Sequence, residues 1–317
     1  MIAVLLLLAS AGLLVAGAEL FVDSAAAAAS RLGVTVLAVA VLLAGAEPEE
    51  LVTAVLASAA DRPGLAVGDA VGANVTMLTV VLGLAALVRP LPVGRRTRTY
   101  AVGAAVAGLL AVLALLGGIG SGEGALLLLA YAGLVALVWR REPAPPVIGE
   151  LSELAELAEL DDEGDGEGED DSDRAPALSL LLVGVGLALM TAGGVLAVEG
   201  ATRLVAALDR TDTAVGLTVL GLVTTAELFA IVLAAARRGV QEVAVAAVVG
   251  SAAYNATATL GAAALAGQLP ATGLDAACLA AVLPLALVAL SRTGRLGRPA
   301  GALLIATYLV FTFLVLG

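Results

Sequence analysis

The chain contains about ten apolar runs, and this pattern limits the possible folds more than any other feature. A helix that crosses a lipid bilayer needs about 20 apolar residues. Hydrophobic residues make up 61% of the 317 residues and charged residues only 14%, and the mean hydropathy is +1.05. The sequence therefore predicts an all-α membrane protein with ten transmembrane helices, at residues 2–22, 34–58, 65–88, 99–118, 124–139, 177–200, 213–236, 241–266, 274–290 and 300–316.

One long polar segment divides these runs into two groups of five. Residues 142–174 hold 14 of the 28 acids, which leaves 14 acids against 15 arginines elsewhere, so the net charge of −12 belongs to this segment. A nearly neutral remainder argues against nucleic acid binding. We expect a first repeat at 1–141, an acidic linker at 142–175 and a second repeat at 176–317.

Within the linker, leucine recurs at every third position of residues 151–160, which favours a short amphipathic helix. The acid- and glycine-rich remainder is expected to be a solvated linker. The alternative is a calcium loop that uses Asp161, Glu163 and Asp165. Its twelfth position is Ser172, where such loops require a glutamate.

The distribution of arginine predicts the orientation. If the N-terminus lies outside, 13 of the 16 arginines fall in cytoplasmic loops, as the positive-inside rule requires. This places both termini outside and the acidic linker in the cytoplasm, with the chain in the cell (inner) membrane. No basic residue precedes the first run, so we expect it to be a helix and not a signal peptide.

The second and seventh runs carry acids where a membrane helix normally has none. An ionisable residue there costs at least about 2.5 to 3.5 kcal/mol and usually faces a cavity, a partner or an ion. The two regions are copies of each other, with pairs at offsets of 176 to 178: Asp23 with Glu199, Glu50 with Glu227, and Ala73 with Ser251. Five helices separate equivalent points, so the copies enter the membrane in opposite directions. Inverted repeats with two broken helices predict a secondary transporter with its site at the midplane.

These residues resemble the cation/calcium exchanger superfamily, which contains the sodium/calcium exchangers. The family motif, near G-T-S-x-P-E-L followed by G-S-N-x-x-N, corresponds to GAEPEEL at 45–51 with GAN at 72–74. Its second copy corresponds to VTTAEL at 223–228 with GSAAYN at 250–255. The resemblance covers both repeats and leaves out only the linker. It implies ten helices, alternating access and a divalent cation site shared by the two repeats.

The resemblance also implies the ligands of this site. Calcium takes six to eight hard oxygen ligands, and the principal pair would be Glu50 and Glu227. Glu47 lies one turn before Glu50 on the same helical face and would join them. The other implied ligands are the carbonyls freed by the helix breaks at Ala46 and Val223, and the polar side chains of Thr224, Thr225, Ser251, Asn255 and Asn74.

The first repeat departs from the family pattern. Glu47 and Ala73 replace hydroxyl residues that bind sodium, and Met77 replaces an amide or acid. Three neighbouring carboxylates favour protons as the coupling ion, because crowded like charges favour the protonated form. The sequence therefore leaves both sodium and protons as candidates for the coupling ion.

Each candidate also has a structural interpretation. Glu50 and Glu227 can be a buried structural pair, and Glu47 can cap a half-helix, since acids are favoured at helix N-termini. Glu49 is expected in a vestibule. Asp69, one turn before Ala73, either lines the ion path or is structural.

Taken together, the sequence predicts a secondary active antiporter that exchanges a divalent cation, with calcium as the first candidate, for sodium or protons. The alternatives are a transporter of manganese or magnesium and a membrane cation sensor that does not transport. The expected partners are the bilayer and small inorganic cations. We expect neither a cofactor nor an enzymatic activity, because no nucleophile with a base, zinc cluster or phosphate loop is present.

Overall fold

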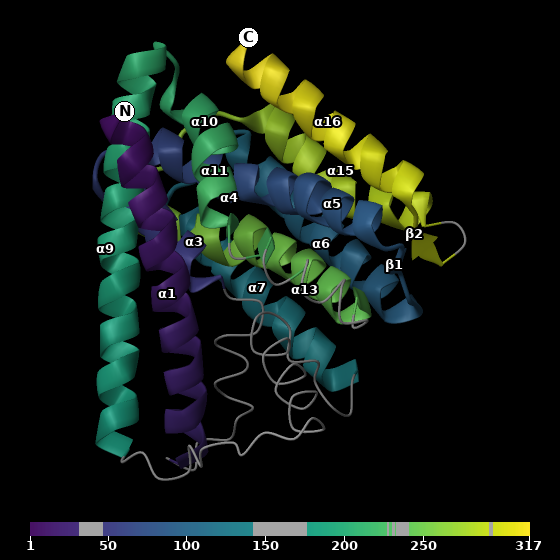
Figure 1. The fold of residues 1–317 in the computed structure, drawn as a ribbon, viewed down its shortest axis with the longest axis horizontal. Helices are drawn as coiled ribbons and strands as arrows, with labels where there is room; N and C mark the ends of the chain where they lie inside the picture. Colours follow the sequence, from purple (N-terminus) through teal and green to yellow (C-terminus); the bar gives the residue numbers. More distant parts are fainter. Residues whose placement is uncertain (32–46, 142–175, 227, 230–231, 233–240, 292–293) are drawn as a thin grey trace.

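The computed structural model describes residues 1–317 except 32–46, 142–175, 227, 230–231, 233–240 and 292–293 (Figure 1). The described residues form helices and one two-stranded antiparallel sheet, in which Leu91 pairs with Leu296. In chain order the elements are α1 (Ile2–Arg31), α3 (Pro48–Ala59), α4 (Pro63–Thr76), η1 (Met77–Val81), α5 (Leu82–Val88), β1 (Leu91–Pro92), α6 (Arg95–Leu115), α7 (Ser121–Arg141), α9 (Pro176–Leu208), α10 (Asp212–Val215), η3 (Gly216–Leu220), α11 (Gly221–Thr224), α13 (Gln241–Tyr254), η4 (Asn255–Thr259), α14 (Leu260–Ala266), α15 (Leu274–Leu290), β2 (Arg295–Leu296) and α16 (Arg298–Leu316).

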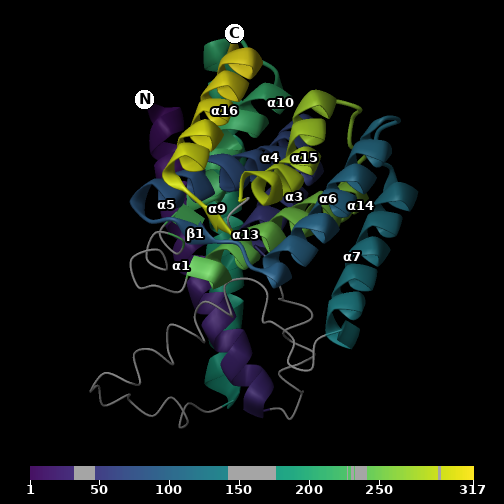
Figure 2. The same cartoon turned by 90° about the vertical axis from the view of Figure 1, so that its right-hand side faces the viewer.

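The two longest helices, α1 and α9, lie side by side at one edge of the molecule (Figures 1 and 2). Glycines bring their backbones close together: a Cβ on Gly17 would lie 2.8 Å from the backbone nitrogen of Met190. Both helices are longer than the runs predicted at 2–22 and 177–200. They continue past those runs because the residues that follow, rich in alanine, are good helix formers.

The helices around the predicted motifs repeat with a constant shift. Helix α4, the π-helical turn η1 and helix α5 have the same lengths as α13, η4 and α14, and each begins 178 residues earlier. The shift equals the offset between Ala73 and Ser251 in the sequence. The internal repeat is therefore a repeat of structure as well, and a π-helical turn interrupts both copies at the same place.

Two short backbone pairings show how the repeats are related. Leu91 pairs with Leu296, and Ile119 pairs with Leu269. Leu91 and Leu269 are 178 residues apart, and Ile119 and Leu296 are 177 apart. Exchanging the two halves therefore converts one pairing into the other, as a two-fold axis between the repeats requires.

Helix α4 crosses the segment α10–η3–α11 at a contact made by glycines. A Cβ on Gly68 would lie 2.7 Å from the Cα of Gly216, and one on Gly221 would lie 2.6 Å from the backbone nitrogen of Ala73. A Cβ on Gly72 would collide with the backbone of Leu217. Small residues allow this backbone contact in membrane helices, and it brings the two predicted motif regions together.

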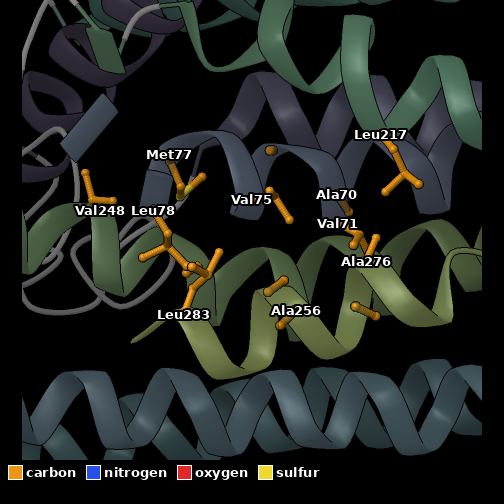
Figure 3. Close-up of a cluster of buried hydrophobic side chains, with 14 of the residues drawn as sticks. Ala70, Val71, Val75, Met77, Leu78, Leu217, Val248, Ala256, Ala276 and Leu283 are labelled. Atoms are coloured by element: carbon orange, nitrogen blue, oxygen red, sulfur yellow. The ribbon is translucent and has the colours of Figure 1, made fainter. Parts of the chain in front are cut away.

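The main hydrophobic core lies between the repeats. Figure 3 shows side chains of α4 and η1 close to those of η3, α13, η4 and α15. The labelled members are Ala70, Val71, Val75, Met77, Leu78, Leu217, Val248, Ala256, Ala276 and Leu283. On the periphery apolar side chains are exposed instead, with Phe313 and Leu314 on α16 at 74% and 73%. An apolar exterior suits a lipid surround.

Several described segments are apolar enough to cross a membrane. Five are also long enough: 2–21, 63–88, 97–115, 181–208 and 298–316. Three shorter apolar helices, at 121–137, 212–224 and 274–290, accompany them. Both termini lie at the same end of the molecule in Figures 1 and 2. This placement agrees with an even number of crossings.

Candidate functional site

The first predicted motif forms the N-terminus of α3. Pro48 is the first helical residue and Glu47 is the N-cap. Proline suits this position because its missing N–H has no intrahelical partner there. The backbone N–H of Glu50 donates to the carbonyl of Glu47 at 3.1 Å. The helix therefore begins with three acids, Glu47, Glu49 and Glu50, near the positive end of its dipole.

Two of these acids meet an amide from the second repeat. Asn255, the first residue of η4, donates from Nδ2 to Glu47 Oε2 at 3.3 Å and also to Glu50 Oε2. The hydroxyl of Thr259 donates to Asn255 Oδ1 at 2.9 Å, which fixes the orientation of the amide. Glu50 and Asn255 are fully buried and Glu47 is 2% exposed. Side chains of both repeats thus join in one buried polar cluster.

Two oxygens in this cluster have no hydrogen-bond partner among the described residues, Glu47 Oε1 and Glu50 Oε1, and neither has Thr53 Oγ1 further along α3. The carboxyl of Glu47 also interacts with the carboxyl of Glu50 and with Ser251. A buried polar atom without a partner loses its water without compensation. Unpartnered carboxylate and hydroxyl oxygens of this kind are suited to bind a hard cation.

Asn74 makes a second connection between the repeats, in which the donor belongs to the first repeat and the acceptor to the second. Its Nδ2 donates to the carbonyl of Ala252 at 3.0 Å, while Oδ1 has no partner among the described residues. The same shift of 178 relates Asn74 to Ala252, so this bond joins two equivalent positions. Asn74 therefore holds α4 to α13 and keeps one buried oxygen available.

The second motif places Thr224 at the C-terminus of α11. Thr224 is 2% exposed, and its hydroxyl lies 3.0 Å from Asp69 Oδ1 on α4 and 3.2 Å from the carbonyl oxygen of Leu220. Thr225 follows as the C-cap, and its N–H donates to the carbonyl of Val223, so that predicted carbonyl already has one partner. Asp69, which was left out of the predicted ligand set, thus lies against one of its members.

The remaining predicted residues have different outcomes. Glu227 and Ala46 lie outside the described residues, as do the linker helix and calcium loop considered above. Glu49, expected in an open vestibule, is instead 1% exposed, because the first turn of α3 packs among other helices. In the described part of the chain, no group of three or more acidic, histidine or cysteine side chains is spaced to hold one metal ion.

Asn255 is expected to stabilise the cluster measurably. Replacing it with alanine leaves Glu47 Oε2 and Glu50 Oε2 without their donor, at a cost of about 1 to 3 kcal/mol. The thermal unfolding midpoint of purified Asn255→Ala protein in detergent should therefore fall by several degrees. The control is Thr307→Ala, which removes an exposed hydroxyl from α16. Equal midpoints for the two variants would contradict the prediction.

The fold and the site together define a membrane cation carrier built from two related halves. A family model described as "Sodium/calcium exchanger protein" matches residues 2–140 and 178–317. The chain belongs to the sodium/calcium exchanger family.

Individual relatives agree with this assignment. The putative antiporter CaxA of Alkalimonas amylolytica is 26% identical over 338 residues, 99% of both chains. The sodium/calcium exchanger MaX1 of Methanosarcina acetivorans is 34% identical over 89 residues, 27% of this chain and 25% of the relative. A solved structure of the sodium-calcium exchanger NCX_Mj, soaked with Na⁺ and Sr²⁺, covers 98% of both chains with a TM-score of 0.58 and 24% identity.

These findings confirm the resemblance to the exchanger superfamily, the all-α membrane fold and the predicted function as a cation antiporter. The count of ten helices stays a prediction, and so do the breaks in the second and seventh helices. Both depend on residues 32–46 and most of 227–240, which lie outside the described residues.

Proposed function

We propose that the chain is an inner-membrane antiporter that exchanges calcium for sodium by alternating access. Glu50 and Glu227 are the principal calcium ligands in this proposal, one from each repeat. Glu47, Asn74, Thr224, Ser251 and Asn255, with the carbonyls of Ala46 and Val223, complete the set. The first and sixth helices, represented by α1 and α9, move across this fixed site.

One observation carries the proposal. Glu47 and Glu50 lie buried in an apolar bundle, share the amide of Asn255 from the other repeat, and each keep one oxygen without a partner among the described residues. A structural network would be expected to satisfy its members, because half-satisfied buried polar groups are costly. A site that exchanges ions has to leave oxygens available to its cargo. The arginine distribution supports an orientation with both termini outside.

The test is calcium-45 uptake into proteoliposomes that hold the purified full chain. Uptake is compared with an outward sodium gradient, an outward proton gradient and no gradient. We expect uptake with the sodium gradient, because the chain belongs to the sodium/calcium exchanger family. Uptake driven by the proton gradient alone would show that protons, and not sodium, are the coupling ion. Inhibition of calcium uptake by manganese or magnesium would show that the transported cation is not calcium alone. Absence of gradient-driven uptake of any divalent cation would refute the transporter.

An experiment on the acidic linker distinguishes a transporter from a cation sensor. The family match leaves out residues 141–177, so the exchange machinery is expected to lie outside the linker. Deleting Glu150 to Asp173 should leave sodium-driven calcium uptake within about twofold of the full chain. The matched control replaces the same segment with a glycine–serine linker of equal length. Loss of uptake in the deletion together with retention in the replacement would indicate a spacer, and loss in both would favour the sensor.

A further inference from the structure

Asp69 is a buried acid to which the predicted exchange site gives no role. It is fully buried on α4, in a helix that carries no other charged residue. Its Oδ1 lies 3.0 Å from the hydroxyl of Thr224, and its Oδ2 has no hydrogen-bond partner among the described residues. A buried carboxyl group stays charged only where it is paired with a positive charge or binds a cation, and otherwise it takes up a proton.

No side chain of the described residues supplies this positive charge. The sequence has no lysine and no histidine. The ion pairs of the described residues, Arg62 with Asp212 and Arg203 with Glu199, have exposed or partly exposed members and do not include Asp69. A diffusible cation is therefore the natural partner for the carboxylate.

The position of Asp69 breaks the symmetry of the repeats. The shift of 178 relates Asp69 to Ala247, so the second repeat has no acid there. The same shift relates Ala73 to Ser251 and Met77 to Asn255, so the first repeat lacks two oxygen ligands that the second retains. Asp69 restores an oxygen ligand to the first repeat, one helical turn before Ala73.

The groups around Asp69 form a suitable set of oxygens. The hydroxyl of Thr224 lies between Asp69 Oδ1 and the carbonyl oxygen of Leu220, at 3.0 and 3.2 Å. Helix α11 ends at Thr224, so the negative end of its dipole faces this point. In transporters with broken helices, such C-terminal ends coordinate sodium or protons. A carboxylate and a hydroxyl together suit a small monovalent cation.

Asp69 has a different hydrogen-bond partner from the pair formed by Glu47 and Glu50: Thr224 and not Asn255. The described residues contain no group of three acids spaced for a single metal ion. Asp69 and the two glutamates repel one another electrostatically. Asp69 is therefore near enough to sense a divalent ion at the glutamates, while its own hydrogen-bond partner is the hydroxyl of Thr224.

We propose that Asp69 forms a sodium subsite that shares Thr224 with the divalent site, and that Asp69 replaces the oxygen ligands that Ala73 and Met77 lack. Asp69 then determines the affinity for the coupling ion and contributes little to calcium binding. This inference rests on the proposed exchange function.

The first experiment measures sodium binding without transport. The thermal unfolding midpoint of the purified full chain is followed against sodium chloride, with choline chloride holding the ionic strength constant. A ligand that binds the folded state raises stability with its concentration, so the wild-type midpoint should rise with sodium. In Asp69→Asn the sodium concentration for half of the effect should increase at least about tenfold. Asp275→Asn, which removes an exposed acid from α15, is the control and should match wild type.

The second experiment separates the coupling ion from the cargo. In proteoliposomes, Asp69→Asn should lose most sodium-driven calcium uptake, while calcium self-exchange without sodium stays within about threefold of wild type. Should Asp69→Asn fail to fold, Thr224→Val tests the same subsite from the other helix by the sodium dependence of its unfolding midpoint alone, because Thr224 is also a proposed calcium ligand. Equal loss of self-exchange would overturn the proposal, because Asp69 would then belong to the calcium site or to the fold.

The outcomes also separate this inference from the proposed function. A wild type with no gradient-driven calcium uptake refutes the exchange function, yet a sodium-dependent midpoint that Asp69→Asn weakens would still support the subsite. A wild type that exchanges calcium, with the same sodium dependence in Asp69→Asn, refutes the subsite alone. A midpoint and an uptake that respond to pH but not to sodium overturn the sodium assignment.

Discussion

Replacing Glu50 with glutamine is expected to reduce sodium-driven calcium uptake at least about 100-fold. The substitution keeps the size of the side chain and removes its charge. Removing one charge from a buried, hydrogen-bonded set costs about 2 to 5 kcal/mol, and each 1.4 kcal/mol corresponds to about a tenfold change in affinity. The variant should still fold, because the new side-chain amide retains an oxygen that can accept from Asn255. Initial rates of calcium-45 uptake and calcium affinity in proteoliposomes measure the loss.

A matched control and the internal repeat sharpen this experiment. Glu19→Gln removes an exposed acid from α1 and should leave uptake within about twofold of wild type. Glu227→Gln should cause a loss similar to that of Glu50→Gln, because the repeat makes the two positions equivalent. Uptake in Glu50→Gln within about threefold of wild type would refute its role as a principal ligand. A large loss in Glu50→Gln with full activity in Glu227→Gln would show that the site belongs to the first repeat alone.

Replacing Gly72 with valine is expected to prevent formation of the native helix crossing. A Cβ at this position collides with the backbone of Leu217, and backbone cannot move aside as a flexible side chain can. Overpacking a core typically costs about 1 to 3 kcal/mol and occasionally more. A clash between a new side chain and a neighbouring backbone belongs at the upper end of that range or above it. The purified variant should lose its monodisperse peak in detergent or unfold at a much lower temperature.

The control for this prediction is Gly103→Val on α6. A Cβ there meets nothing within 4 Å, so the same chemical change inside another membrane helix should have little effect. Similar elution profiles and unfolding midpoints for the two valine variants would show that the crossing tolerates bulk. The contact between Asp69 and Thr224 would then not depend on the close approach of α4 to η3.

The repeat and the acids at the start of α3 could be predicted from sequence because both depend on local order. The offset of 178 between Ala73 and Ser251 reappears in the bounds of α4 and α13, since equal sequence patterns form equal helices. Pro48 sets the start of α3 for the same local reason. Of the predicted ligands, Glu47, Glu50 and Asn255 meet in the structure.

Other features depend on contacts between distant segments. No sequence pattern distinguished a structural role for Asp69 from an ion-path role, because its partner Thr224 lies 155 residues away. The burial of Glu49 was missed for the same reason, since a charged residue in the first turn of a helix looks like a surface residue until its neighbours are known. In the first repeat, Ala73 and Met77 lack the oxygen ligands of the family pattern, and the nearby acid Asp69 has no counterpart in the second repeat. Together these two features were the signal in the sequence for a functional role of Asp69.

Hydropathy, periodicity and spacing are properties of the chain alone. They were enough to predict that this protein crosses the membrane, that it consists of two copies of one unit and that its apolar helices carry acids. Which polar groups meet became known only from the folded arrangement: Asn255 with Glu47 and Glu50, and Thr224 with Asp69. These contacts depend on helix crossings, set here by glycines that let two backbones touch, and no local pattern encodes which helix will be the partner.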